Sequence, residues 1–257
     1  MIFSKNKSMV CYHPQPDAAL RLVCFPCAGA GASMYRRWGM LLPNVEVWSV
    51  NYPGRETLHA MPLANSMTDI VSLLMSDAAF WSDRKLVLYG HSFGALVSFW
   101  TGLRLQQDGL FVQGLLVSAR RAPHLASEQS YQGLSDNQLV ARLDRFGGIP
   151  AAIRHDADMM GFYLPVIKAD LLVNDAAQTQ PDDVIDAPVY LYSGTGDDVA
   201  SAEELVAWQR CTRRGFTHRQ FNGGHFFIQE QQDAFVAAIR TAISALSSED
   251  EEELIAF

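Results

Sequence analysis

The stretch Gly90-His91-Ser92-Phe93-Gly94 decides the fold of this chain. It lies between an apolar run at residues 85–89 and a helix-like run at residues 95–100. A serine in a G-x-S-x-G turn between a strand and a helix is typical of a nucleophile elbow, which lifts the hydroxyl clear of a sheet. The two glycines are needed because the chain crosses itself so tightly that a Cβ would clash. The motif alone is common by chance, so its strand and helix context carries the prediction.

Further apolar runs and amphipathic segments alternate along the chain. The predicted strands are residues 20–25, 45–50, 85–89, 112–118, 188–193 and 215–221. The predicted helices are residues 34–42, 66–80, 95–100, 202–213 and 229–246. This alternation predicts an α/β fold with one open, mostly parallel sheet and helices on both faces. A length of 257 residues without repeats or a linker suits a single domain over residues 1–257.

The alternation stops between about residues 120 and 186. This part is helix-leaning, is interrupted by glycines and Pro150, and carries apolar stripes at residues 139–146 and 159–172. An insertion of this length between two core strands predicts a helical cap, or lid, over the active face.

The composition is that of an ordinary globular protein, with 49% apolar and 19% charged residues. No run approaches the roughly 18 uninterrupted apolar residues of a membrane span, and the N-terminus lacks the apolar segment of a secretory signal. Four cysteines in a chain of this size do not indicate a disulfide framework. We therefore expect a cytoplasmic protein that binds no membrane. The acidic pI and the lack of a basic stripe argue against nucleic acid as a partner.

The C-terminus is strongly acidic. Residues 249–253 supply five negative charges of the net charge of −8. Such a run is usually a solvated, frayed terminus, so residues 247–257 are predicted to form an acidic C-terminal tail. The apolar residues that follow, 254–257, leave a docking segment as the alternative.

A serine nucleophile needs a base within hydrogen-bond reach and an acid to orient that base. After a nucleophile elbow, the acid and then the histidine follow at the ends of later strands. His225, in the run Gly-Gly-His-Phe after the last predicted strand, is the best-placed histidine. Asp197 is favoured over Asp198 because it lies nearer the strand end in a glycine turn, although either aspartate could simply form the turn. The sequence thus predicts Ser92, Asp197 and His225 as the catalytic residues.

An oxyanion formed by attack of Ser92 needs two hydrogen-bond donors. One is expected from the backbone N–H of Phe93, and the other from residues 27–29 after the first core strand. Cys24 and Cys27 have CxxC spacing, but Cys24 lies in a strand and no second pair exists. We therefore expect neither a metal site nor a cofactor.

Seven motifs in sequence order give the chain a family resemblance. It resembles the type II thioesterases, stand-alone α/β-hydrolases that edit nonribosomal peptide and polyketide assembly lines. The motifs are FPCAG (25–29), YPGRE (52–56), GHSFGA (90–95), RRAPH (120–124), FGGIP (146–150), LPVIKAD (164–170) and GGHF (223–226). The resemblance implies an α/β-hydrolase fold, catalysis by Ser92, Asp197 and His225, and an oxyanion hole made by the Ala28 and Phe93 amides.

The same resemblance implies a function. Members of the family hydrolyse unwanted acyl groups from the phosphopantetheine thiol of carrier domains, and some release intermediates or products instead. Carrier domains of a synthase are thus the expected partners, the phosphopantetheine belongs to the substrate, and a monomer is expected. Two positions depart from the family pattern: Cys27 replaces a histidine, and Phe93 replaces a methionine. Both departures could reshape the acyl pocket, so Cys27 is a candidate substrate contact.

The predicted cap would supply an apolar slot for the acyl chain and a channel for the pantetheine arm. Arg120 and Arg121 lie at a strand end beside it. We hypothesise that they meet an acidic carrier domain or a phosphate, and the alternative is a surface salt bridge.

Three other functions are compatible with the same residues. A carboxylesterase or lipase would use the same machinery, but the chain lacks the H-G-G-G oxyanion loop. Acyl transfer to an amine or alcohol differs only in its product. A catalytically idle scaffold is disfavoured by the intact set of three residues.

Overall fold

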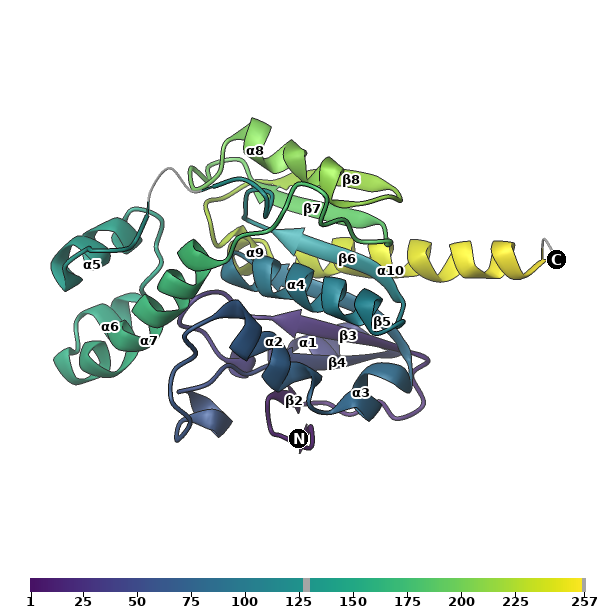
Figure 1. The fold of residues 1–257 in the computed structure, drawn as a ribbon, viewed down its shortest axis with the longest axis horizontal. Helices are drawn as coiled ribbons and strands as arrows, with labels where there is room; N and C mark the ends of the chain where they lie inside the picture. The colour runs from purple at the N-terminus through teal and green to yellow at the C-terminus, as the bar shows by residue number, and fades with distance from the viewer. Residues whose placement is uncertain (127–129, 256–257) are drawn as a thin grey trace.

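The computed structural model describes residues 1–126 and 130–255, and an eight-stranded sheet forms its centre (Figure 1). The spatial order is β1-β2-β4-β3-β5-β6-β7-β8. The strands are β1 (Ile2–Phe3), β2 (Met9–Cys11), β3 (Leu20–Phe25), β4 (Val45–Val50), β5 (Lys85–His91), β6 (Val112–Ser118), β7 (Val189–Gly194) and β8 (Phe216–Phe221). β1 and β2 are antiparallel to their neighbours, whereas β3 to β8 pair in parallel. The predicted α/β-hydrolase architecture, an open and mostly parallel sheet, is confirmed.

Helices cover both faces of the sheet, with α4 in front and α10 passing behind it (Figure 1). The helices are η1 (Ala32–Tyr35), α1 (Trp38–Leu41), η2 (Glu56–Leu58), α2 (Met67–Met75), α3 (Ala78–Ser82), α4 (Phe93–Gln107), α5 (Asp136–Asp144), α6 (Ala151–Arg154), α7 (Ala157–Ala176), α8 (Ala202–Val206), η3 (Ala207–Cys211), α9 (Phe227–Glu230) and α10 (Gln232–Ile255). In the described part of the chain, no helix is both long and apolar enough to span a bilayer.

Side chains of each central strand alternate between two apolar cores because successive residues point to opposite faces. In β3, Val23 and Phe25 join the core that contains α4, whereas Leu22 and Cys24 join the core that contains α10. Burial on both faces explains why these strands read as continuous apolar runs rather than as alternating patterns. The two cores fix the strand ends on which the site is built.

The structure differs from the predicted elements in two main ways. Four predicted helices are each divided: residues 34–42 into η1 and α1, residues 66–80 into α2 and α3, residues 202–213 into α8 and η3, and residues 229–246 between α9 and α10. The short strands β1 and β2 were not predicted, since two or three residues are too few for a period to show. Ser66 does cap α2, because its side chain accepts a hydrogen bond from the Asp69 amide.

The last helix extends beyond the predicted end at residue 246. Helix α10 continues to Ile255, in keeping with the favourable helix propensity of glutamate. The side chains from residue 249 onward, and residues 256–257 entirely, lie outside the described part of the chain. An acidic tail at 247–257 therefore stays a prediction.

Helices α5, α6 and α7 lie between β6 and β7 in sequence and extend away from the sheet (Figure 1). They share a small apolar cluster of their own, formed by the buried residues Leu139, Leu143, Ile149, Ile167 and Leu171. Pro165 divides α7 into an N-terminal half without fully buried side chains and a C-terminal half that packs into the protein. We call these three helices the cap; its role as a lid and its limits at about 120–186 remain predictions.

Candidate active site

The elbow places Ser92 at the C-terminal end of β5. Its backbone has φ 55° and ψ −117°, a strained conformation for a residue with a side chain. A Cβ on Gly90 would collide with the backbone of Gly94, and a Cβ on Gly94 would collide with the backbone of Phe25. The Ser92 amide donates to the Ser118 carbonyl over 2.8 Å, which ties the turn to β6. Sterics and sheet pairing together hold the hydroxyl at the edge of the sheet.

Ser92, His225 and Asp197 form a hydrogen-bonded chain. His225 Nε2 lies 3.0 Å from Ser92 Oγ, and His225 Nδ1 lies 3.0 Å from Asp197 Oδ2 and 3.1 Å from Oδ1. The His225 and Asp197 side chains are only 2% and 4% exposed. Asp198 is exposed and is not hydrogen-bonded to His225. The structure thus brings together the three residues that the sequence predicted, with Asp197 rather than Asp198 at the His225 ring.

A second histidine, His91, lies beside the hydrogen-bonded set of Ser92, His225 and Asp197. His91 is fully buried, its Nδ1 lies 2.8 Å from Ser118 Oγ, and its ring lies 5.3 Å from the His225 ring. Burial, with a smaller contribution from His225, lowers the pKa of His91 well below its usual value. Because His91 is neutral, it places no second positive charge beside the His225 ring when that ring takes up a proton.

The two predicted oxyanion donors lie at the ends of neighbouring strands. Phe93 is the first residue of α4, where backbone N–H groups have no partner within the helix. Ala28 lies in the loop after β3, and its amide donates to no acceptor in the described part of the chain. Both amides are therefore available to an oxyanion at Ser92.

The loop that carries Ala28 is held by a buried ion pair. The Gly29 amide donates to Asp170 Oδ2 over 2.8 Å. Arg55 donates to both Asp170 oxygens, over 2.5 and 2.7 Å, and to the Ala30 carbonyl over 3.2 Å. The Arg55 and Asp170 side chains are 5% and 4% exposed. Cap helix α7 and the loop after β4 thus jointly fix the oxyanion loop.

Sequence reasoning gave Arg55 and Asp170 no role. Both lie in motifs that carry the family resemblance, YPGRE and LPVIKAD. An arginine in one of these motifs and an aspartate in another could have suggested an ion pair between the two motifs. Their separation by 115 residues gave no indication that they meet.

An apolar cavity of about 510 Å³ lies between the oxyanion loop and the cap. Its walls include Cys27, Ala28, Phe146, Ile149 and Ile167. Burial raises the pKa of Cys27 to about 12, with a further contribution from Asp170. The Cys27 thiol therefore stays protonated near neutral pH and serves as an apolar wall.

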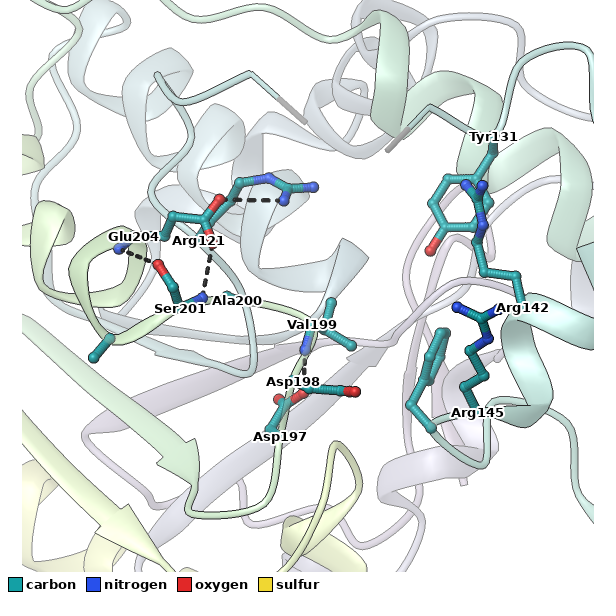
Figure 2. A pocket seen from close by; sticks show the side chains of 12 residues that line it. Arg121, Tyr131, Arg142, Arg145, Asp197, Asp198, Val199, Ala200, Ser201 and Glu204 are labelled. Atoms are coloured by element: carbon teal, nitrogen blue, oxygen red, sulfur yellow. Dashed lines mark hydrogen bonds and ion pairs between the residues drawn. The ribbon is translucent and has the colours of Figure 1, made fainter. Parts of the chain in front are cut away.

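A second cavity, of about 560 Å³ (Figure 2), shares the wall residue Phe146 with the first. Asp197 and Asp198 form part of one wall, and Arg142 and Arg145 reach in from the opposite side. The Phe146 ring contacts His225 edge-on with ring centroids 5.1 Å apart and lines both cavities. His225 thus contacts a residue that both cavities share, although it lines neither of them.

The two arginines predicted as carrier contacts have different surroundings. Arg120 is half-buried and donates a hydrogen bond to Asn174 of α7. Burial and the neighbouring Arg121 lower the pKa of Arg120 to about 9, so it remains a cation at neutral pH. Arg121 lines the second cavity and lies 3.6 Å from Glu204.

Residues 20–243 match the thioesterase domain family. The chain belongs to this family. This thioesterase is 34% identical over 223 residues to thioesterase PikA5 of Streptomyces venezuelae, covering 86% of this chain and 79% of the relative. It is 33% identical over 231 residues to the gramicidin S biosynthesis protein GrsT of Aneurinibacillus migulanus, covering 88% and 90%.

A solved structure extends the match to three dimensions. The type II thioesterase BorB from the borrelidin biosynthetic cluster superimposes on this thioesterase with a TM-score of 0.83 and 29% identity, covering 93% of this chain and 98% of BorB. The resemblance predicted from the motifs is therefore confirmed: the protein is a thioester hydrolase of the type II thioesterase group.

Proposed function

We propose that this thioesterase removes aberrant or stalled acyl groups from the phosphopantetheine arm of carrier domains in nonribosomal peptide or polyketide biosynthesis, with Ser92, His225 and Asp197 as its catalytic residues. Type II thioesterases act on the carrier domains of synthases. The observation that carries the proposal is the hydrogen-bonded chain from Ser92 through His225 to Asp197. Phe146, whose ring contacts His225, lines both cavities beside it.

In the proposed reaction, Asp197 accepts the Nδ1–H of His225 and so leaves Nε2 free to accept the Ser92 proton. Ser92 Oγ then attacks the thioester carbonyl, and the Phe93 and Ala28 amides donate to the developing oxyanion. The protonated His225 gives its proton to the departing thiolate. Water, deprotonated by the same ring, attacks the acyl-enzyme. The bond from the acyl carbon to Ser92 Oγ then breaks, His225 returns the proton to that oxygen, and the carboxylic acid is released.

The apolar cavity beneath the cap supports the assignment of the acyl group. Its volume of about 510 Å³ falls in the range typical of ligand pockets, which is about 300–1,000 Å³. Cys27 would contact the acyl chain there, where the family pattern has a histidine. The cap would act as the lid over this chamber. We further propose that the protein is a cytoplasmic monomer and that Arg120 and Arg121 meet an acidic carrier domain or a phosphate.

Hydrolysis of an acyl-carrier protein, compared with the matching free oxygen ester, tests the proposal. We expect faster hydrolysis of the carrier-bound thioester. Ser92→Ala is expected to lower kcat by about 10³-fold or more, because loss of the nucleophile disables the whole set. A fluorophosphonate probe should label Ser92 in the wild type.

The alternatives predict different results from the same assays. Preference for the oxygen ester would indicate an esterase, and an amide or new ester product would indicate an acyltransferase. Absence of an adduct at Ser92 would rule out the catalytic assignment.

A further inference from the structure

Two arginines of the cap lack an acidic partner. Arg142 in the last turn of α5 and Arg145 just after it both line the 560 Å³ cavity. Neither forms an ion pair with a carboxylate in residues 1–126 and 130–255. Arg142 donates to the Ser130 carbonyl over 2.7 Å and lies over the Tyr131 ring at 5.1 Å. The exposed Arg145 side chain makes no hydrogen bond within those residues.

This arrangement favours an anion from outside the protein. Residues three apart on a helix are neighbours, so Arg142 and Arg145 place two like charges on one surface, which is unfavourable without a counter-charge. Two of the three acids of the facing wall have other partners: Asp197 binds His225, and Glu204 pairs with Arg121 and caps α8. Asp198 is exposed on that wall and forms no ion pair in the described residues.

The cavity lies next to the pocket at the proposed nucleophile, because the two share wall residues. Ser92 lines a narrow pocket of about 40 Å³, and Arg121, Tyr131 and Val199 line both this pocket and the larger cavity. Figure 2 shows the Tyr131 hydroxyl, Arg142 and Arg145 on the cap side of the cavity, opposite the segment that carries Asp197. A long, thin group with an anionic end could therefore lie with its reactive end at Ser92.

We propose that Arg142 and Arg145, with the Tyr131 hydroxyl, bind the phosphate of the pantetheine arm while the acyl group occupies the apolar cavity beyond Phe146. This inference rests on the proposed function. Guanidinium groups suit a phosphate because their N–H donors match its oxygens and their charge persists at all physiological pH values. The cavity with arginines then takes the arm, and the apolar cavity takes the acyl chain.

The test compares two small thioesters that differ only in the phosphate: an acyl-pantetheine and the same acyl-4′-phosphopantetheine. We expect the wild type to have a KM about tenfold lower for the phosphorylated thioester, with similar kcat. Raising the salt concentration should reduce this difference, because the site is open to solvent. Arg145→Gln, which removes no contact within the described residues, should raise KM for the phosphorylated thioester alone.

Arg154→Gln is the matched control. This cap arginine pairs with Asp144 at 3.2 Å and lines neither cavity. It should keep the wild-type preference for the phosphorylated thioester. Equal KM values for both thioesters in the wild type, or an unchanged preference in Arg145→Gln, would overturn the phosphate site while leaving the thioesterase function intact. Failure to hydrolyse either thioester would overturn both.

Discussion

Asp197 and Asp198 are neighbours in sequence with opposite surroundings. The Asp197 carboxylate is 4% exposed and receives hydrogen bonds from His225 and the Val199 amide, whereas Asp198 is exposed to solvent. Only Asp197 can hold the His225 ring in the tautomer that leaves Nε2 free for Ser92. The difference between them lies in where each side chain points.

Asp197→Asn is expected to lower kcat by about 10²–10⁴-fold, because an amide can stabilise the wrong tautomer of His225 and cannot balance its positive charge. Steady-state kinetics on a short acyl thioester without phosphate measure the effect. Asp198→Asn is the matched control, and its kcat on the same thioester should stay within about threefold of the wild type. A larger loss in Asp198→Asn than in Asp197→Asn would reverse the assignment.

The buried cysteines make stability depend on pH. Burial raises the pKa of Cys11 to about 11, and the pKa values of Cys27 and Cys211 to about 12. Unfolded cysteine loses its proton near pH 8.5–9, so between that pH and about 11 the unfolded state binds fewer protons than the folded state. The free energy of unfolding should therefore fall as the pH rises from 8.5 to 11. Urea denaturation at several pH values measures this, and Cys27→Ala should weaken the dependence.

At the scale of elements, helix α7 connects the cap to the oxyanion loop. Its C-terminal half carries Ile167, which lines the apolar cavity and lies against Gly29, and Asp170, which accepts from the Gly29 amide. A change in the position of α7 would therefore act on the apolar cavity and on the loop that carries Ala28 together. Under the proposed function, this contact would let the cap influence the position of an oxyanion donor.

Asp170→Asn is expected to lower both stability and kcat. It leaves the buried Arg55 cation without a counter-charge, which typically costs about 3–5 kcal/mol of unfolding free energy. The loosened loop should also lower kcat by about tenfold or more, measured well below the unfolding temperature, with little change in KM.

Asp83→Asn is the control for Asp170→Asn. Asp83 also pairs with a buried arginine, Arg21, but its side chain is 49% exposed. It precedes the first residue of β5, whereas Ser92 follows the last residue of that strand. Its removal should cost less than about 1 kcal/mol, because Arg21 keeps Glu46 as a buried partner and the pair is solvated. A drop in kcat as large in Asp83→Asn as in Asp170→Asn would argue against a positioning role.

At the scale of the whole molecule, the protein consists of a sheet with two large cores and a cap with a small one. The cap cluster has five fully buried apolar residues, whereas each sheet core has many more. Local opening needs less free energy where fewer apolar contacts are lost. The cap should therefore open more readily than the sheet and admit a bulky acyl chain.

Leu143→Ala, which truncates a side chain of the cap cluster, tests whether the cap opens independently of the sheet. Hydrogen exchange should accelerate in α5 and α7, while amides of β5 and β6 keep their wild-type protection. Val117→Ala, in the core beneath α4, is the matched substitution and should lower the protection of the whole sheet. Equal acceleration of cap and sheet in Leu143→Ala would show that the two open as one unit.

The sequence by itself determined the bounds of several core strands and the positions of two predicted catalytic residues. β3, β4 and β6 have the predicted bounds because strands buried on both faces read as unbroken apolar runs. Ser92 and His225 could be selected because each lies in a glycine-containing motif directly after a predicted strand. The order of the seven motifs indicated the family. Short helices and the short strands β1 and β2 were missed, since their few residues show no period.

Tertiary structure alone decided the contacts between distant segments. It placed the favoured Asp197, and not Asp198, against His225 and joined Arg55 to Asp170. It also placed Arg142 and Arg145 on the cavity that Asp197 lines. No local sequence pattern predicts these contacts, because they depend on how the cap packs on the sheet. Propensity and periodicity act over a few residues, whereas a buried ion pair or a shared cavity depends on the path of the whole chain.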